Sequence, residues 1–185
     1  LNPTNHLLIL NNTNMLYTFF SHMAITFTED SAMALYLVQH GKSLPKDIDP
    51  KQGLSEEGIA DVGRIASVAK GYGIRPRRVL HSGKQRALQT ARIFAAALAS
   101  ADRVEEKNGL KPMDDVASFA QNLSVSDDLM LVGHLPFMEK MTSYLITGST
   151  DTLVFKFQNG GIVCLDNDAD NSTWFIKWAL MPNID

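Results

Sequence analysis

Apolar and polar positions follow two alternating patterns along residues 33–185. Short continuous apolar runs, such as MALYLV at 33–38 and DLMLVG at 128–133, are typical of buried strands. Other stretches, such as 56–70, place apolar residues three and four positions apart, which is typical of an amphipathic helix. The two patterns take turns along the chain, so strands and helices are expected to alternate.

The expected strands are short apolar runs at 33–38, 77–82, within 104–110, and at 128–133, 153–158, 161–167 and 173–180. The expected helices lie at 56–70, 84–99, 114–122 and 136–147. Ser55 is the expected N-cap of the first helix, with Glu56 and Glu57 in its first turn. This order predicts an α/β fold, a three-layer α/β/α sandwich around a mostly parallel sheet. The last strands, joined by short turns, are expected to add antiparallel strands at one edge.

Composition narrows the class of protein. Apolar residues make up 45% and charged residues 20% of 185 residues, as in an ordinary globular protein. The net charge of -3 gives no basic field for nucleic-acid phosphates, and the longest strongly apolar stretch, 93–101, is too short to span a bilayer. Cys164 is the one cysteine, which excludes an intrachain disulfide and a multi-cysteine zinc site. We therefore expect a cytoplasmic protein with no nucleic-acid or membrane partner.

The first 32 residues differ from the rest. Residues 1–30 contain no Lys or Arg and are rich in Asn and Thr, so they match neither a secretory signal nor a transit peptide. We interpret 1–32 as an N-terminal extension, either a poorly ordered tail or the result of a start assigned too far upstream. The domain is expected to cover 33–185.

Polar clusters follow three of the expected strands, at 39–42, 81–86 and 133–136. Ligands of open α/β sheets bind outside the carboxyl ends of the strands, so these clusters are expected to converge if the strands are neighbours. The candidate residues are Gln39, His40, Gly41, Lys42, Arg86 and His134. Histidine and arginine side chains, glycine backbone and helix N-termini together favour an anion, most naturally a phosphate. His81 is interpreted as structural and Lys84 as solvated.

The segments LYLVQHG, HSGKQRALQTA and LMLVGHLP together resemble the histidine phosphatase superfamily, which has the phosphoglycerate mutase-like fold, and most closely its SixA-type phosphohistidine phosphatases. The resemblance implies that His40 is the nucleophile that becomes phosphorylated. It implies that Arg86 holds the phosphoryl oxygens and that His134 adds a hydrogen bond or a positive charge. It further implies a phosphatase that needs no cofactor or metal and acts on a phosphorylated protein, such as a histidine-containing phosphotransfer or carrier protein.

The first motif departs from the family, because Gln39 stands where the family has arginine. A neutral amide cannot form the two-pronged guanidinium contact, so one positive charge is missing from the expected pocket. Two consequences are open. The enzyme works with a weaker phosphate clamp, aided by Lys42, which we favour, or the protein has lost catalysis and kept phosphate binding.

The general acid of the family's phosphomonoesterases and mutases has no clear counterpart in this chain. Asp114 and Asp115 are the nearest candidates for an acid or a substrate contact, and an exposed helix N-terminus explains them equally well. The long insertions that enclose small substrates in larger relatives are missing as well. The sequence therefore favours phosphohistidine in a protein as the substrate, with a small-molecule phosphomonoesterase or mutase as the alternative. Thr90 is interpreted as a residue that packs or back-bonds within its helix. Asn159 is a candidate to line the pocket, and a hairpin turn explains it well.

Overall fold

The computed structural model describes residues 34–98, 103–123, 128–168, 170 and 172–183. The expected extension at 1–32 and its boundary with the domain lie outside the described residues. Among the described residues, no helix combines the length and the apolar character that crossing a bilayer requires.

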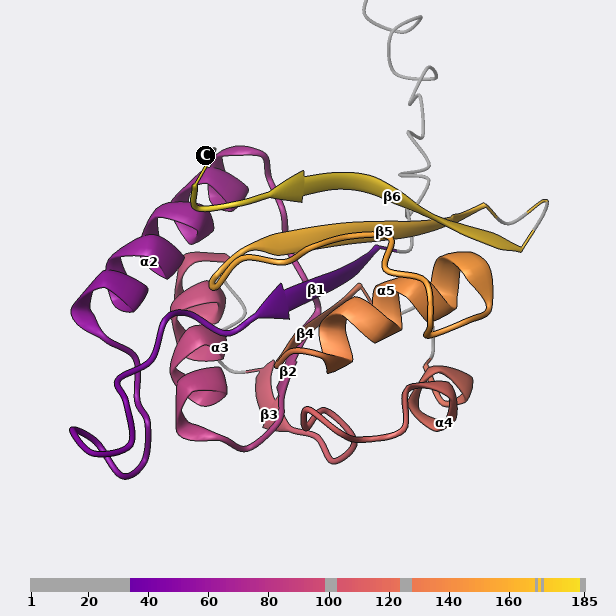
Figure 1. The fold of residues 1–185 in the computed structure, drawn as a ribbon. Helices are drawn as coiled ribbons and strands as arrows, with labels where there is room; N and C mark the ends of the chain where they lie inside the picture. Colours follow the sequence, from indigo (N-terminus) through magenta and orange to yellow (C-terminus); the bar gives the residue numbers. More distant parts are fainter. Residues whose placement is uncertain (1–33, 99–102, 124–127, 169, 171, 184–185) are drawn as a thin grey trace, which may run out of the picture. The chain divides into compact units, whose positions relative to one another are not determined.

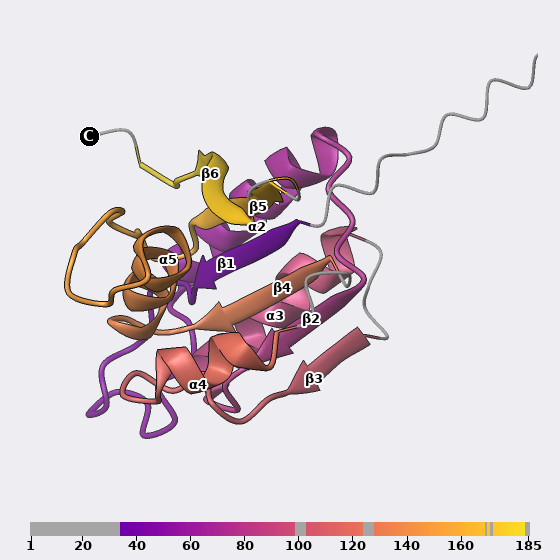
Figure 2. The same cartoon turned by 90° about the vertical axis from the view of Figure 1, so that its right-hand side faces the viewer.

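The centre of the domain is a mixed six-stranded sheet with the strand order β3-β2-β4-β1-β5-β6. Its strands are β1 (Leu35–Gln39), β2 (Arg78–His81), β3 (Val104–Glu106), β4 (Leu129–Gly133), β5 (Ile162–Asp168) and β6 (Thr173–Leu180). β3, β2, β4 and β1 pair in parallel, whereas β5 runs antiparallel to both β1 and β6 (Figures 1 and 2). The expected mostly parallel sheet with antiparallel strands at one edge is confirmed.

Helices cover both faces of this sheet (Figure 1). α2 (Glu56–Gly71) and α3 (Gln85–Leu98) lie on one face, and α4 (Val116–Gln121) and α5 (Phe137–Thr147) lie on the other. The sheet alternates to match: Val38 packs with α2 and α3, whereas Leu37 packs with α4 and α5. Because each face of the sheet is apolar, each needs a helical layer to exclude water, and the three-layer sandwich results.

The first helix begins as its sequence predicts. The Ser55 side chain accepts a 3.0 Å hydrogen bond from the backbone N–H of Gly58, and Glu56 and Glu57 occupy the first turn. The cap satisfies one of the free N–H groups of the helix end, and the two carboxylates lie at the positive end of the helix dipole.

The expected strand at 153–158 is wrong. This segment forms no strand and packs on the face covered by α4 and α5, where the Phe155 and Phe157 rings meet edge to face with centroids 5.4 Å apart. Its alternating aromatic residues mimic the period of a strand. However, β1 and β6 already occupy both edges of β5, so the segment has no free edge of β5 to pair with.

The topology brings the three polar clusters together. β1, β4 and β2 are adjacent and parallel, with Gln39 opposite Gly133 and His81 opposite Val132. Their carboxyl ends therefore lie side by side at one edge of the sheet (Figure 2). This confirms that the three strands are neighbours.

Candidate active site

His40 follows β1, and hydrogen bonds from two directions hold its backbone. Its N–H donates to the carbonyl of Gly133 at the end of β4, over 3.0 Å. Its carbonyl accepts from the Asn159 side chain over 2.9 Å. The imidazole is therefore carried by backbone that is tied both to the parallel sheet and to the turn before β5.

The environment of His40 fixes the tautomer of its ring. Nδ1 lies 2.8 Å from the carbonyl oxygen of Gly41, which can only accept, so Nδ1 carries the proton. Nε2 accepts a 3.0 Å hydrogen bond from Nε of Arg86, so it holds a lone pair. Burial, and the charges of Arg86 and Lys84, lower the His40 pKa to about 4 in spite of the Gly41 contact. At neutral pH this imidazole is neutral, and its unprotonated nitrogen is Nε2.

Arg86 lies in the first turn of α3, where two side chains help to place it. Its Nη1 donates to Oε1 of Gln52 over 3.3 Å. The Thr90 hydroxyl donates to the Arg86 carbonyl over 2.8 Å and accepts from the N–H of Gly41 over 3.0 Å. The expected back-bond of Thr90 is confirmed, and the same hydroxyl links the arginine turn to the backbone beside His40.

His134 follows β4, and its ring lies against His40, with centroids 4.8 Å apart and planes tilted by 60°. It is almost fully buried, and its Nε2 lies 2.6 Å from the Ser82 hydroxyl. Burial, and then the charges of His40 and Arg86, lower the His134 pKa to about 3, so the ring is neutral at neutral pH. Among the described residues its Nδ1 has no hydrogen-bond partner. A buried polar atom left in this way calls for an explanation, which a bound ligand would supply.

Gln39 is buried at the last position of β1, with 8% of its surface exposed. Its side-chain oxygen has no hydrogen-bond partner in the part of the chain that the structure describes. Half a turn of the amide would place NH₂ where the oxygen lies and so offer a donor to an anion. The position of the family's arginine thus holds a buried amide whose oxygen has no hydrogen-bond partner among the described residues.

Gly41 is required by close packing rather than by an unusual backbone angle. A Cβ on Gly41 would lie 2.7 Å from a methyl group of Val62 and 3.0 Å from the carbonyl oxygen of Gly58, both in α2. The loop after His40 can therefore pass the start of α2 only without a side chain at this position.

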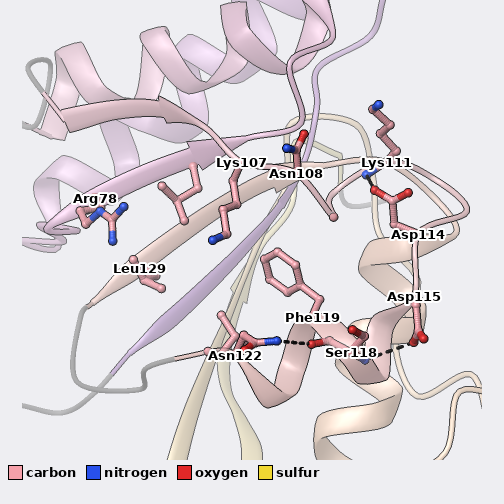
Figure 3. Close-up of a pocket in the computed structure, with 13 residues that line it drawn as sticks. Arg78, Lys107, Asn108, Lys111, Asp114, Asp115, Ser118, Phe119, Asn122 and Leu129 are labelled. Atoms are coloured by element: carbon pink, nitrogen blue, oxygen red, sulfur yellow. Dashed lines mark hydrogen bonds between the residues drawn. The ribbon is translucent and has the colours of Figure 1, made fainter.

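Two of the expected phosphate-binding residues do not contact the histidines. The Lys42 ammonium is exposed and pairs with Glu57 at the start of α2. The Asp114 carboxylate accepts from the N–H of Lys111 over 2.8 Å and lines a pocket of about 850 Å³ between the sheet and α4 (Figure 3). His40, Arg86 and His134 are not among the residues that line this pocket. Asp115 caps α4 by accepting from the N–H groups of Ala117 and Ser118.

Sequence reasoning missed the roles of three residues at the site. Ser82 contacts His134, and its place directly after β2 is the signal in the sequence that points to the site. Asn159 lies in a turn, as expected, and its side chain also donates a hydrogen bond to the His40 carbonyl. Gln52, which contacts Arg86, lies in a loop and has a left-handed backbone with φ of 51°. Nothing in the sequence around it points to a role at the site. The His81 ring, expected to be structural, accepts a 3.1 Å hydrogen bond at Nδ1 from the N–H of Gly83.

No protein family model matches this chain, and neither does any curated protein. Solved structures do match it. The protein histidine phosphatase SixA, complexed with tungstate, superposes with a TM-score of 0.69 at 22% identity, covering 80% of this chain and 97% of that one. The protein named as phosphohistidine phosphatase SixA in Agrobacterium tumefaciens gives a TM-score of 0.65 at 25% identity, covering 82% and 99%. Alpha-ribazole phosphatase from Shigella flexneri gives 0.64 at 15% identity, covering 82% and 98%.

These structural neighbours are phosphatases of the histidine phosphatase superfamily, and the fold of this chain is the phosphoglycerate mutase-like fold that they share. The resemblance to SixA-type proteins, expected from three short motifs, is confirmed at the level of the fold. The neighbours include both protein histidine phosphatases and a small-molecule phosphatase.

Proposed function

We propose that this protein is a phosphatase that removes phosphoryl groups from phosphohistidine in a protein, with His40 as the nucleophile. The observation that carries the proposal is the state of His40. Its Nδ1 proton is held by the Gly41 carbonyl, its Nε2 lone pair faces Arg86, and its lowered pKa keeps the ring neutral. A neutral imidazole with one oriented lone pair is the form that attacks phosphorus.

The proposed reaction has two displacements at phosphorus. In the first, the His40 Nε2 lone pair forms a P–N bond while the P–N bond to the substrate imidazole breaks. The departing imidazole leaves as the neutral ring, since its other nitrogen carries a proton. In the second, water attacks phosphorus, the bond to Nε2 breaks, and phosphate is released with the loss of one water proton. Arg86 stabilises the oxygens in both steps because its guanidinium donates two parallel hydrogen bonds.

The leaving group favours phosphohistidine over alkyl phosphates. An alkoxide needs a proton as it leaves, whereas a protonated imidazole ring leaves with little help. The charged groups identified as acting on His40 are Arg86 and Lys84, both cations. The carboxylate of Asp114, the expected acid candidate, lies in the pocket beside α4. This arrangement would supply positive charge to the phosphoryl group, but no general acid to protonate an alkoxide leaving group.

A histidine-containing phosphotransfer or carrier protein in the cytoplasm is the proposed partner. The likeness to SixA supports a protein substrate, because that neighbour is described as a protein histidine phosphatase. The likeness to alpha-ribazole phosphatase supports the second candidate, a small-molecule phosphomonoesterase or mutase. A non-catalytic phosphate-binding module is the third, on account of Gln39.

One comparison of substrates tests the proposal. Phosphate release is measured from a phosphorylated histidine-containing carrier protein and from sugar phosphates at the same pH. We expect a higher kcat/KM for the phosphorylated protein. An equal or higher value for sugar phosphates would favour the small-molecule enzyme, and binding of phosphate with no turnover of either class would favour the non-catalytic module.

A further inference from the structure

We propose that Lys84 binds the phosphoryl oxygens of the substrate together with Arg86. It would thereby supply the positive charge that is missing because neutral Gln39 stands where the family has arginine. The inference rests on the proposed function and adds a binding residue that neither the family motifs nor the first interpretation of the sequence assigned. Lys42, the cation expected to compensate, is the alternative that the structure disfavours.

The position of Lys84 in the chain is the first argument. The segment from Ser82 to Arg86 runs past both imidazoles: the Ser82 hydroxyl lies 2.6 Å from Nε2 of His134, and Nε of Arg86 lies 3.0 Å from Nε2 of His40. Along the chain, Lys84 lies midway between the two residues that make these contacts. Its carbonyl accepts from the N–H groups of Ala87 and Leu88, so its backbone is fixed at the start of α3.

The turn that carries Lys84 is itself held in place. Gly83 adopts a left-handed backbone angle of 82°, which favours glycine, and its N–H donates to His81. The carboxylate of Glu106 lies against Gly83, and a Cβ at this position would force that carboxylate to move. The Lys84 side chain itself is exposed to solvent. A flexible ammonium with three donors can close on the oxygens of an arriving phosphoryl group.

Electrostatics point in the same direction. The charges of Arg86 and Lys84 both lower the pKa of His40 and the pKa of His134, so Lys84 lies close enough for its field to reach both rings. No ion pair joins Lys84 to a carboxylate within the described ranges, whereas Lys42 is paired with Glu57. A cation whose charge acts on both histidines, and which has no carboxylate partner within the described ranges, is available to an incoming anion.

Tungstate binding to the full chain, measured by titration calorimetry at low and constant ionic strength, tests this inference. We expect Lys84→Met to weaken tungstate binding about fivefold, and Lys84→Arg to stay within about twofold of the unaltered protein. Lys42→Met is the rival variant and is expected to have no effect. Lys70→Met, at the far end of the roughly 24 Å long α2, is the control for a general loss of one positive charge. The effect of Lys84→Met should shrink as salt is added, because salt screens an exposed charge.

The outcomes separate this inference from the function on which it rests. If the unaltered protein and Lys84→Met bind tungstate equally well, or if Lys42→Met loses as much affinity, Lys84 is not the compensating cation, and the phosphate site itself stands. If the unaltered protein binds no tungstate, both the inference and the proposed function are overturned. Thermal unfolding of each variant shows whether an altered affinity reflects an altered fold.

Discussion

Nε of Arg86 donates a 3.0 Å hydrogen bond to Nε2 of His40. The side chain proposed to bind the phosphoryl group therefore rests, before substrate arrives, on the nitrogen proposed to attack it. An incoming phosphoryl group must replace this contact and take the Arg86 donor for its own oxygens. In the proposed reaction, Arg86 would therefore pass from one hydrogen-bond acceptor, His40 Nε2, to another, the phosphoryl oxygens. The Nε2 lone pair would become free when the phosphoryl group is in place.

His40→Ala is expected to abolish phosphohistidine hydrolysis and to leave the fold intact, because the backbone hydrogen bonds of this residue to Gly133 and Asn159 remain. The measurement is turnover together with thermal unfolding. Activity that survives within about tenfold, a change in barrier of about 1.4 kcal/mol, would mean that His40 is not the nucleophile.

The His40 ring is expected to titrate near pH 4 rather than near its ordinary value of 6.5. Since burial and neighbouring cations disfavour the charged form, the neutral nucleophile should dominate above pH 4 and be lost as the pH falls through that value. Proton NMR of the ring signals, with His40→Ala to assign them, measures this directly. A midpoint near pH 6.5 would show that the ring is neither as buried nor as close to Arg86 and Lys84 as described.

Ser82→Ala is expected to lower both the stability and the turnover of the protein. It leaves Nε2 of the buried His134 ring without its partner, which costs about 1–3 kcal/mol of unfolding free energy. Urea unfolding and kcat are the measurements. Ser143→Ala is the matched control, since the buried Ser143 hydroxyl donates to the carbonyl of Glu139 within its own helix α5. Similar behaviour of the two variants would remove Ser82 from the site.

Much of the fold could be predicted because the sequence expresses it locally. The apolar runs of β1, β2 and β4, the Ser55 cap and the helical spacing of α2 and α3 are all set by nearby residues. The segment 153–158 could not be predicted correctly, because its local pattern is that of a strand. Whether it could pair with β5 depends on which edges of β5 are free, and both are taken by β1 and β6, which come from other parts of the chain.

The site shows the same division. His40 and Arg86 could be placed from their motifs, and the topology brings them into contact. Lys42 was a reasonable candidate by proximity in sequence, yet Glu57, fifteen positions further along, pairs with its side chain. Gln52 and Asn159 reach the site from loops whose paths the sequence does not reveal. Motifs predict which backbone enters the site, whereas the direction of an exposed or loop side chain depends on its neighbours in space.

Gln39→Arg is expected to raise the affinity for phosphate or vanadate. It adds a charge-assisted donor pair at a buried position that already adjoins the carboxyl end of β4. The measurement is inhibition of turnover by vanadate. In the Lys84→Met background the same change should restore affinity, because one cation replaces the other. Unchanged or weaker inhibition by vanadate would show that the position does not face the phosphate.

The most direct test of the account is transfer of a radiolabelled phosphoryl group from a phosphorylated histidine-containing carrier protein to this chain. After rapid quenching, we expect a label on the chain that is stable in alkali and lost in acid, as a phosphoramidate is, and that is missing from His40→Ala. Release of labelled phosphate with no trapped label at any quench time, or a label that persists in His40→Ala, would contradict a covalent intermediate on His40.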